Sequence, residues 1–593
     1  MSIQRNIQKS FLMGSTALTR PAATLGAMAA MVLGSGSAFA IDANTLPSGG
    51  TVTGGAATIS QNGSRLDVNQ STNRTVLDWR SFDIGENAHV NFNQPNSGSI
   101  AVNRINQSTN PTQINGQLTA NGHVWVLNPN GVMFGASARV DVSGLVASTA
   151  NINVDRFMAG DTRLDLLGAG GGSVVNEGQI TVREGGLAAF VAPHVRNNGT
   201  IRAKVGKVAM AAGETFTLDL AGDRLIEIGL GADGAKAEQL GQVVAEGGVI
   251  EISAKAATQV VDSIVNVEGI TSAASATVAG GEIILGGGEV NVAGTLDASG
   301  ATGGGSISID GETITTESAA VLKADATDNG DGGSIIAYAD GHGDYAGSFS
   351  AKGGANGGDG GFVETSGKVV KIDSDISVNT LAPQGSAGNW TIDPDNLAVI
   401  AGLDEGSINP AASFVNNATI VNQLATTGVT LAANNSISVD AEIDSSGQGS
   451  STTLALNDED ANNDLTINLN AAITLGANQT LTGEGTVVNV NNGTSIQNGV
   501  DVAASGAQLN VGAGAYGAGT VVSSSKTGLT IDGGNVARVD VANGEIGFEV
   551  RGNGTTISGF EIAGPVVDSW LDTDWNDSAF SSSLGVTVPV APG

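Results

Sequence analysis

Four stretches of the sequence decide the fold: GGSISI (304–309), GGSIIA (332–337), GGFVET (360–365) and GNWTID (388–393). Their first glycines lie 28 residues apart each time, and a fifth stretch, GGEIIL (280–285), begins 24 residues before the first of them. A short apolar strand cannot bury itself alone, whereas stacked copies of one strand-and-turn unit bury a continuous core and pair each strand with its neighbours. The repeats therefore predict a solenoid of parallel strands.

The same pattern extends in both directions along the chain. The segments NEGQI (176–180) and NNGTI (197–201) recur at 21 residues, and GLTI (528–531) and GTTI (554–557) recur at 26. A variable period fits a solenoid, because insertions fall in turns and leave the strands aligned. We predict an all-β chain folded as a right-handed parallel β-helix with an N-terminal cap. A glycine-rich flexible linker and an array of β-sandwiches are the alternatives.

The composition supports a packed core rather than disorder. The chain of 593 residues has 87 glycines and only 12 prolines, and 40% of its residues are hydrophobic. Glycine permits the positive φ that tight corners need, and a disordered chain shows a lower apolar fraction and a higher charge. Short strands joined by glycine turns therefore account for the composition.

Five segments follow from the repeats and the composition. We expect, in chain order, a signal peptide (1–40), a first β-helical domain (41–280), glycine-rich repeat coils (281–395), further coils (396–570) and a loose tail (571–593). An uncovered first coil would leave an open sheet edge, so a cap is physically required. Residues 41–80 are expected to supply it, with Trp79, Phe82 and Phe92 as aromatic residues of the cap or core.

The first 40 residues have the features of a secretory signal. Three basic residues precede or flank an apolar run (22–34), which is shorter than the roughly 20 residues that span a membrane. Ala38 and Ala40 give the small-x-small pattern of a cleavage site. We therefore predict export by the Sec machinery and a mature chain that begins at Ile41, rather than an N-terminal membrane anchor.

The charge balance limits the classes of partner. The chain has 25 Lys and Arg against 58 Asp and Glu, which gives a net charge of −33. Such a surface repels nucleic acid and favours solubility, so we exclude nucleic acid as a partner. There is no cysteine, so neither disulfides nor thiolate metal sites can form.

Four ordered blocks in the first domain carry a family resemblance. They are LDWRSFDIG (77–85), VNFNQPNSGSIAVNRI (90–105), INGQLTANGHVWVLNPNGVMFG (114–135) and VVNEGQITVREGGLAAFVAPHVRNNGTI (174–201). This part of the chain resembles the N-terminal secretion domain of filamentous haemagglutinin-like exoproteins, the passengers of two-partner secretion in Gram-negative bacteria. The later block GGFVETSG (360–367) resembles segments found further along such passengers.

The resemblance implies a secretion route. A separate β-barrel transporter in the outer membrane would bind the first domain, the two-partner secretion domain (41–280), and thread the chain to the cell surface or the extracellular space. The block Asn128-Pro129-Asn130-Gly131 matches the hallmark of the family, which helps the transporter to recognise the domain. A second family motif, Asn-Pro-Asn-Leu, does not occur in this sequence, which leaves open how the transporter contacts this region.

The recognition motif is also a turn sequence in its own right. Proline presets φ for the second position of a turn, and Asn-Gly accepts left-handed geometry. We therefore expect Asn128–Gly131 to form one tight corner of the helix, whether or not it also contacts the transporter.

No residue pattern predicts an enzyme or a cofactor. Two groups of acidic residues are the metal candidates: Asp325, Asp328 and Asp331, and Asp458, Glu459, Asp460 and Asp464. Both lie in loops where turn chemistry explains them. The first group has a spacing that suits Ca²⁺ but lacks the distant bidentate glutamate of an EF-hand. The four histidines lie far apart in the sequence and form no metal-ligand spacing.

The sequence favours a structural function outside the cell. We expect an adhesin or cell-surface interaction protein, whose partner is a glycan or a protein on a host or neighbouring cell. A β-helical carbohydrate-active enzyme is the first alternative, because parallel β-helices also support lyases and hydrolases of polysaccharides. A protein that captures haem or another nutrient is the second alternative.

Overall fold

The computed structural model describes most of the chain after the predicted signal peptide. The described residues are 41–164, 171–213, 215–218, 226–230, 235–254, 263–402, 412–460, 464–542 and 544–564. The chain divides into two units, Met1–Ile41 and Asp42–Gly593, and all the described strands and helices lie in the second. The cleavage residues Ala38 and Ala40 and the predicted tail (571–593) lie outside the described residues.

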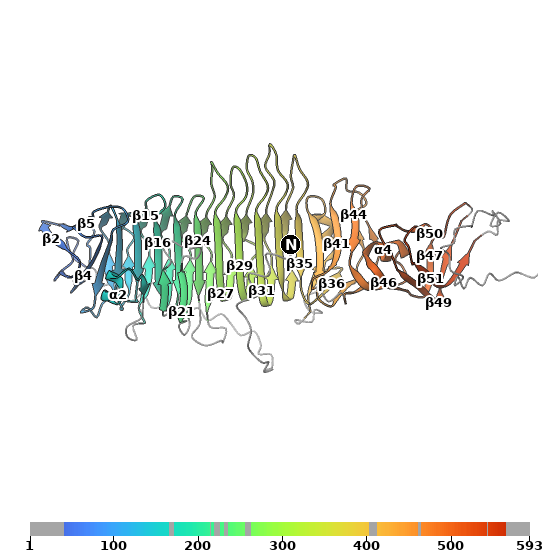
Figure 1. Ribbon diagram of the computed structural model, residues 1–593, viewed down its shortest axis with the longest axis horizontal. Helices are drawn as coiled ribbons and strands as arrows, with labels where there is room; N and C mark the ends of the chain where they lie inside the picture. The colour runs from blue at the N-terminus through green and yellow to red at the C-terminus, as the bar shows by residue number, and fades with distance from the viewer. Residues whose placement is uncertain are drawn as a thin grey trace, which may run out of the picture. The chain divides into compact units, whose positions relative to one another are not determined.

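The second unit is a parallel β-helix, so the predicted fold is confirmed. Each coil places strands on three faces, and equivalent strands of successive coils pair in parallel (Figure 1). One coil shows the path: β9 (His123–Leu127) lies on the first face, β10 (Val132–Phe134) on the second and β11 (Arg139–Val142) on the third. The chain then returns to the first face as β12 (Gly144–Ser148), which pairs in parallel with β9.

Three series of strands, one for each face, stack along the helix. The first face contains β4 (Arg74–Trp79), β6 (Ile100–Ile105), β9, β12, β16 (Leu187–Ala192), β19 (Lys207–Ala212), β24 (Val249–Ala254), the first halves of β27 (Glu282–Val292), β29 (Ser306–Thr316), β31 (Ser334–Tyr345) and β33 (Phe362–Ile372), then β35 (Asn389–Asp393), β38 (Gly428–Ala433), β41 (Thr453–Asp458) and β44 (Thr480–Gly483). The second face contains β7 (Thr112–Ile114), β10, β14 (Ser173–Asn176), β17 (His194–Asn197), β22 (Lys236–Gln239), β25 (Ile264–Val267), the second halves of β27 to β33, β37 (Phe414–Asn416), β36 (Asn396–Ile400), β39 (Ser436–Val439), β42 (Thr466–Leu469), β45 (Gly485–Val490), β46 (Ala503–Val511), β49 (Thr530–Asp540) with its neighbour β47 (Gly514–Gly517), and β51 (Thr556–Ala563). The third face contains β3 (Arg65–Gln70), β5 (His89–Asn93), β8 (Gln117–Ala120), β11, β15 (Gln179–Val182), β18 (Thr200–Ala203), β23 (Gln242–Val244), β26 (Ile270–Ser272), β28 (Thr295–Asp297), β30 (Val321–Lys323), β32 (Ser348–Ser350) and β34 (Ser377–Asn379), followed by two separate pairs, β40 (Ile443–Asp444) with β43 (Ile473–Thr474) and β48 (Thr520–Val522) with β50 (Phe548–Val550).

A cap of antiparallel strands covers the first coil, as predicted for residues 41–80. Strand β1 (Thr51–Gly54) pairs antiparallel with β4, and β2 (Ala57–Asn62) forms an antiparallel hairpin with β3. Strand β3 then begins the parallel series by pairing with β5. The ring centroids of Trp79 and Phe82 lie 5.4 Å apart in an edge-to-face contact, and both rings are buried. The cap therefore removes the open edge that a bare first coil would leave.

The interior of the helix follows from strict alternation along the strands. In β29, Ile307 and Ile309 are buried whereas Ser306 and Ser308 are half-buried on the outer side. Burial of one such side chain contributes about 1.5–3 kcal/mol. One continuous hydrophobic cluster formed in this way runs through the coils from Leu66 to Val539.

The 28-residue repeats stack as predicted except at the last one. Ser306 pairs with Ser334 and Ser334 with Phe362, which are offsets of 28 residues. The sequence alignment then places Trp390 opposite Phe362, but the structure pairs Trp390 with Val363, an offset of 27. A shift of one residue reverses the face of every side chain in a strand. The observed register places the Trp390 ring in the core, where it is fully buried.

A buried ladder of amide side chains explains the NEGQI and NNGTI repeats. Asn176 Nδ2 donates to Asn197 Oδ1 at 2.8 Å, and Asn197 Nδ2 donates to Gln239 Oε1 at 2.7 Å. The glycine two residues after each asparagine allows the coils to approach closely at this corner. A Cβ atom at Gly199 would lie 2.2 Å from the carbonyl oxygen of Gly178, so no other residue fits there.

Short helices interrupt the coils, and the sequence analysis did not predict them. Helix α2 (Val154–Met158) follows β12, and α3 (Asn417–Gln423) and α4 (Ile496–Val502) lie in the later coils. Gln423 Oε1 accepts a hydrogen bond of 2.9 Å from the backbone of Val378, so α3 takes the place of a strand beside β34. Among the residues that the structure describes, no helix is long and apolar enough to cross a membrane.

Candidate transporter-recognition corner and acidic clusters

The predicted recognition motif, Asn128–Gly131, forms the corner between β9 and β10. The backbone N–H of Gly131 donates to the carbonyl of Asn128 at 2.9 Å, which closes a four-residue turn. Gly131 has a φ of +114°, in the region that favours glycine. The backbone N–H of Asn130 donates to Asn128 Oδ1 at 3.0 Å. The tight turn that the sequence predicts is therefore confirmed.

The Asn128 side chain is fully buried and holds the preceding loop in place. Its Nδ2 donates to the carbonyl of Asn110 at 3.0 Å and to Thr112 Oγ1 at 3.1 Å. Its Oδ1 accepts the Asn130 N–H. The amide of Asn128 is thus committed to bonds inside the domain, and a partner that meets the folded corner cannot contact it.

The outward part of the corner consists of Pro129 and Asn130, which are both half-buried. Asn130 Nδ2 donates to the carbonyl of Ser108 at 2.8 Å. The next coil packs closely on the turn, since a Cβ atom at Gly172 would lie 2.5 Å from the carbonyl carbon of Asn130. Only two side chains of the motif can therefore contact a transporter once the domain has folded.

A hydrophobic layer on the outer side of the first face is a feature that the sequence analysis missed. We call it the outer layer; it is the second cluster of buried apolar residues and includes Val76, Val102, Trp125, Leu127, Val146, Ala189 and Phe157. The segment 149–164 with α2 covers it, and the ring centroids of Trp125 and Phe157 lie 5.7 Å apart. The runs VWVL (124–127) and LAAFVA (187–192) carry the signal, because a strand buried on both faces is apolar at consecutive positions.

An arginine fastens the covering segment to the helix. Arg74 Nη1 donates to the carbonyl of Phe157 at 2.8 Å, and its guanidinium carbon lies 4.9 Å from the centre of the Phe157 ring. Arg74 belongs to β4, at the start of the coils, whereas Phe157 follows β12. The contact therefore joins two parts of the first domain that lie 83 residues apart.

The four histidines occupy separate strands, in keeping with their spacing. His89 Nδ1 lies 2.9 Å from Arg65 Nη1, and its Nε2 lies 2.7 Å from Thr119 Oγ1. Burial lowers the pKa of His123. His194 is exposed on β17, and His342 Nε2 lies 2.9 Å from Asp344 Oδ1. Among the described residues, no histidine belongs to a group of side chains that could hold a metal ion.

The calcium candidates Asp325, Asp328 and Asp331 act as rungs between neighbouring coils. Asp325 Oδ1 accepts from Ser350 Oγ at 2.6 Å and from the backbone of Lys352 at 2.8 Å. Asp328 and Asp331 likewise accept hydrogen bonds from residues 28 positions later in the chain. Among the described residues, the structure does not bring these three carboxylates together as one metal-binding group.

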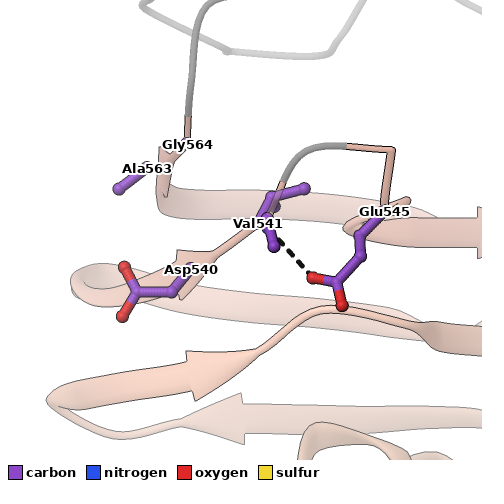
Figure 2. A pocket seen from close by; sticks show the side chains of 6 residues that line it. Asp540, Val541, Glu545, Ala563 and Gly564 are labelled. Atoms are coloured by element: carbon purple, nitrogen blue, oxygen red, sulfur yellow. Dashed lines mark hydrogen bonds between the residues drawn. The ribbon is translucent and has the colours of Figure 1, made fainter.

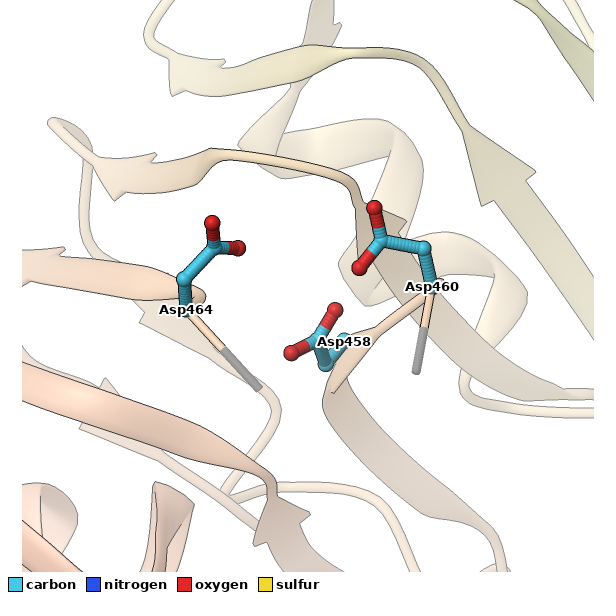
Figure 3. A group of neighbouring side chains, drawn as sticks. All are labelled: Asp458, Asp460 and Asp464. Atoms are coloured by element: carbon cyan, nitrogen blue, oxygen red, sulfur yellow. The ribbon is translucent and has the colours of Figure 1, made fainter. Parts of the chain in front are cut away.

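The second acidic group does come together. Carboxylate oxygens of Asp458, Asp460 and Asp464 lie within 4.8 Å of one another at the end of β41 (Figure 3). The Asp458 side chain is half-buried, and the backbone of Leu465 and of Asp460 lies close enough to lower its pKa. Burial and the charge of Asp460 outweigh these contacts, so the net effect is a raised pKa of Asp458. Three oxygen ligands of this kind suit a hard cation, although exposed acidic groups are common without one.

An open hollow lies beside the last described coil (Figure 2). Its lining consists of Asp540, Val541, Ala542, Glu545, Ala563 and Gly564. Glu545 Oε2 accepts from the backbone of Ala542 at 2.9 Å, and Figure 2 shows the Asp540 carboxylate pointing away from Glu545. The two acids are therefore not arranged as a pair for acid–base chemistry, which requires two carboxyl groups that flank one bond.

Comparison with known proteins identifies the first domain. Residues 43–298 match the family described as the TPS secretion domain, which extends 18 residues beyond the boundary predicted at 280. The solved secretion domain of HMW1 from Haemophilus influenzae aligns with a TM-score of 0.49 and 25% identity, over 58% of this chain and all of that one.

Two curated relatives each match part of the chain. A heme/hemopexin-binding protein of Haemophilus influenzae strain Rd is 34% identical over 223 residues, and a second protein of that name from Haemophilus influenzae is 42% identical over 88 residues. These alignments cover 24% and 9% of the relatives' lengths, and 37% and 15% of this chain. Neither relative is named as an enzyme. Residues 43–298 are therefore similar to a TPS secretion domain, the part of a two-partner secretion exoprotein that directs export through the outer membrane by way of an outer-membrane transporter.

Proposed function

We propose that the exoprotein acts outside the cell as an adhesin or cell-surface interaction protein. The observation that carries the proposal is the series of parallel strands on the second face that follows the secretion domain, from β29 to β51. Their outward positions alternate with core positions, so each coil adds a similar strip to a broad outer surface. Repetitive surfaces of this kind suit extended partners on cells, because many weak contacts along one partner combine into firm binding.

Adhesion can be tested with the purified mature chain and with a strain that lacks the gene. We expect the labelled protein to bind host or neighbouring bacterial cells saturably, and the deletion strain to adhere less until the gene is restored. If the protein binds no cell type and the deletion leaves adhesion unchanged, the proposal fails.

We further propose that the Asn128–Gly131 corner promotes secretion mainly through the turn that it forms. The buried amide of Asn128 bonds to the preceding loop, so it can reach a transporter only before the domain folds. The variants Asn128→Ala and Asn130→Ala separate the two possibilities in a secretion assay with the transporter co-expressed. We expect secretion to fall in step with domain stability, and therefore more for Asn128→Ala. A large loss of secretion for Asn130→Ala at unchanged stability would indicate direct contact instead.

Capture of haem or of hemopexin is a second candidate function, and the names of the two curated relatives favour it. If this proposal is correct, we expect the purified protein to carry haem or to develop a Soret band on titration with hemin. Immobilised hemopexin should also retain the mature chain. A colourless protein that shows neither behaviour would count against capture and leave adhesion as the proposal.

A further inference from the structure

The outer side of the second face changes character in the later coils. Strands β39, β42, β45 and β46 turn apolar side chains such as Ile437, Ile467 and Leu509 into the core, where they are fully buried. The alternate positions face outward and, apart from Val487, carry small polar or amide side chains. We call these outward residues the amide face: Ser438, Asn468, Asn489 and Asn510 in one column, and Asn470 and Asn491 beside it.

The residues of the amide face stack in register. Ser438 pairs with Asn468, Asn468 with Asn489, and Asn489 with Asn510 in successive parallel strands. Asn489 Nδ2 donates to Asn468 Oδ1 at 2.8 Å, and Asn510 Nδ2 donates to Asn489 Oδ1 at 2.9 Å. In the second column, Asn491 Nδ2 donates to Asn470 Oδ1 at 2.5 Å. The two columns fix the orientation of every amide along the stacking direction.

This arrangement leaves hydrogen-bonding capacity on the solvent side. A primary amide has two N–H donors and an oxygen with two lone pairs, and the bonds along each column use one donor and one acceptor of an internal rung. Asn489 therefore keeps one further donor and one further acceptor, whereas Asn470 also donates to Asp440 and Asn510 also accepts from Gln508. The free groups recur along the column at the strand spacing of about 4.8 Å. Asn470, Asn491 and Asn510 are exposed, and Asn468 and Asn489 are half-buried.

The charge of the amide face sets it apart from the rest of the later coils. Residues 299–593 contain 34 Asp and Glu against 7 Lys and Arg, yet the six residues of the amide face carry no charge. Acidic side chains lie only at its two ends: Asp440 accepts hydrogen bonds from Ser438 and Asn470, and Asp532 pairs with Asn510. The acidic surroundings repel sulfated or carboxylated polymers. A neutral surface that alternates donors and acceptors matches a partner that is itself neutral and rich in hydroxyl groups, since each hydroxyl both donates and accepts.

We propose that the amide face binds a neutral polysaccharide that lies along the columns of amides. The proposal rests on the proposed function and specifies one partner class for it. Each sugar contributes little on its own, because the face offers hydrogen bonds in competition with water. Binding then depends on several rungs engaged at once, so long polymers are bound and single sugars are not. A neutral partner also makes the interaction insensitive to salt.

The test uses the full mature chain on immobilised neutral polysaccharides, namely a β-glucan, an α-glucan and a mannan, with alginate as the acidic polymer. The triple variant Asn468→Ser, Asn489→Ser and Asn510→Ser removes the main column. The double variant Asn69→Ser and Asn93→Ser is the matched control, because it removes an exposed amide pair of the third face, in which Asn93 Nδ2 donates to Asn69 Oδ1 at 2.8 Å. Thermal unfolding checks that both variants fold. If the triple variant does not fold, the single variant Asn510→Asp replaces it.

We expect retention on at least one neutral polymer and none on alginate, with retention unchanged by salt. The triple variant should bind at least tenfold more weakly, while the control variant binds like the wild type. Absence of binding to all three neutral polymers, or equal binding by the triple variant, would overturn the proposal. Cell adhesion measured in parallel distinguishes failure of the amide-face proposal from failure of the proposed function. Adhesion that persists in the triple variant refutes only the role of the amide face. A wild-type protein that adheres to no cell refutes the proposed function.

Discussion

The secretion domain (43–298) and the coils that follow it share one core but differ in their surfaces. Residues 43–298 contain 15 Lys and Arg against 23 Asp and Glu, whereas residues 299–593 contain 7 against 34. The first region also has the outer layer, which the segment 149–164 covers. In the second region, the described outward positions carry mainly polar side chains. The same type of coil thus has a partly covered, weakly acidic surface in the secretion domain and a strongly acidic surface in the later coils.

The difference shows how the two regions depend on their contacts. In the later coils, each strand pairs only with the preceding and following coils, as in other repeat proteins. The secretion domain adds a contact outside this order, because Arg74 reaches Phe157 across 83 residues. The covering segment can therefore pack on the outer layer only after several coils have folded. Loss of this packing is expected to unfold the covering segment without unfolding the coils.

The largest predicted effect compares one phenylalanine from each region. Phe349 is fully buried inside the helix, and Phe157 is buried in the outer layer. Phe349→Ala is expected to destabilise the protein by about 3–5 kcal/mol, as for other buried phenylalanines, and to lower the thermal midpoint of the later coils. Phe157→Ala is expected to detach the covering segment while the coils stay folded.

Hydrogen exchange measured by mass spectrometry distinguishes the two outcomes. For Phe157→Ala, we expect faster exchange in residues 149–164 and unchanged exchange in the core strands of the later coils. If the variant lowers protection throughout the unit, the outer layer contributes to the global fold, and the contrast between the regions is wrong.

A smaller effect is expected at the recognition corner of the secretion domain. Gly172→Ala places a Cβ atom 2.5 Å from the carbonyl carbon of Asn130, and overpacking of this kind costs about 1–3 kcal/mol. Gly171→Ala is the matched control, because nothing lies within 4 Å of its Cβ position. Denaturant unfolding of both variants checks the prediction. Equal stability of Gly172→Ala and Gly171→Ala would mean that the backbone at this corner can shift at little cost and that the corner is not a rigid turn.

The repeats predicted the fold because each carries its own strand, turn and core positions. The cap followed from the need to close a sheet edge. The register at Trp390 could not be predicted, because the loop between β34 and β35 (380–388) has nine residues against eleven between β32 and β33 (351–361), whereas the spacing of the glycines stays at 28. Helices α3 and α4 were missed for a related reason: Gln423 acts on Val378, in the preceding coil, and a single sequence does not show that contact.

In the candidate sites too, local features were predicted from the sequence and contacts between coils were not. The turn at Asn128–Gly131 is local, and its sequence predicts it. The burial of Asn128 depends on Asn110 and Thr112 in the preceding loop, so only the structure shows that its amide is occupied. The calcium spacing of Asp325, Asp328 and Asp331 is equally local, but their partners lie one coil away. Chain-local patterns are thus visible in the sequence, whereas contacts between coils are not.

The rungs of the acidic coils are expected to be metal-independent. Asp325→Ala leaves Ser350 Oγ and the Lys352 N–H without their acceptor, which costs about 1–3 kcal/mol for a buried site. Asp331→Ala, at an exposed position with one hydrogen bond, serves as the control and should cost less. Unfolding is measured in Ca²⁺ and in EDTA. If Ca²⁺ raises the stability of the wild type and both variants abolish this rise, Asp325, Asp328 and Asp331 would again be candidates for a calcium site.

The smallest predicted effect concerns the three carboxylates at the end of β41. The folded-state pKa of Asp458 is raised by burial and by Asp460, so the folded protein holds a proton there that the unfolded chain, with a pKa near 3.9, has already released. The free energy of unfolding therefore falls as the pH rises from the pKa of Asp458 in the unfolded chain to its raised pKa in the folded protein. Above the folded-state pKa, the destabilisation by the charged carboxylate is present in full. Asp458→Asn removes that cost, so the variant should be more stable than the wild type at neutral pH, by less than about 1 kcal/mol for a partly exposed group. The advantage should vanish in acid. Thermal midpoints measured across this pH range in EDTA check the sign, and a variant that is less stable at neutral pH would show that the Asp458 charge stabilises the later coils rather than opposing them.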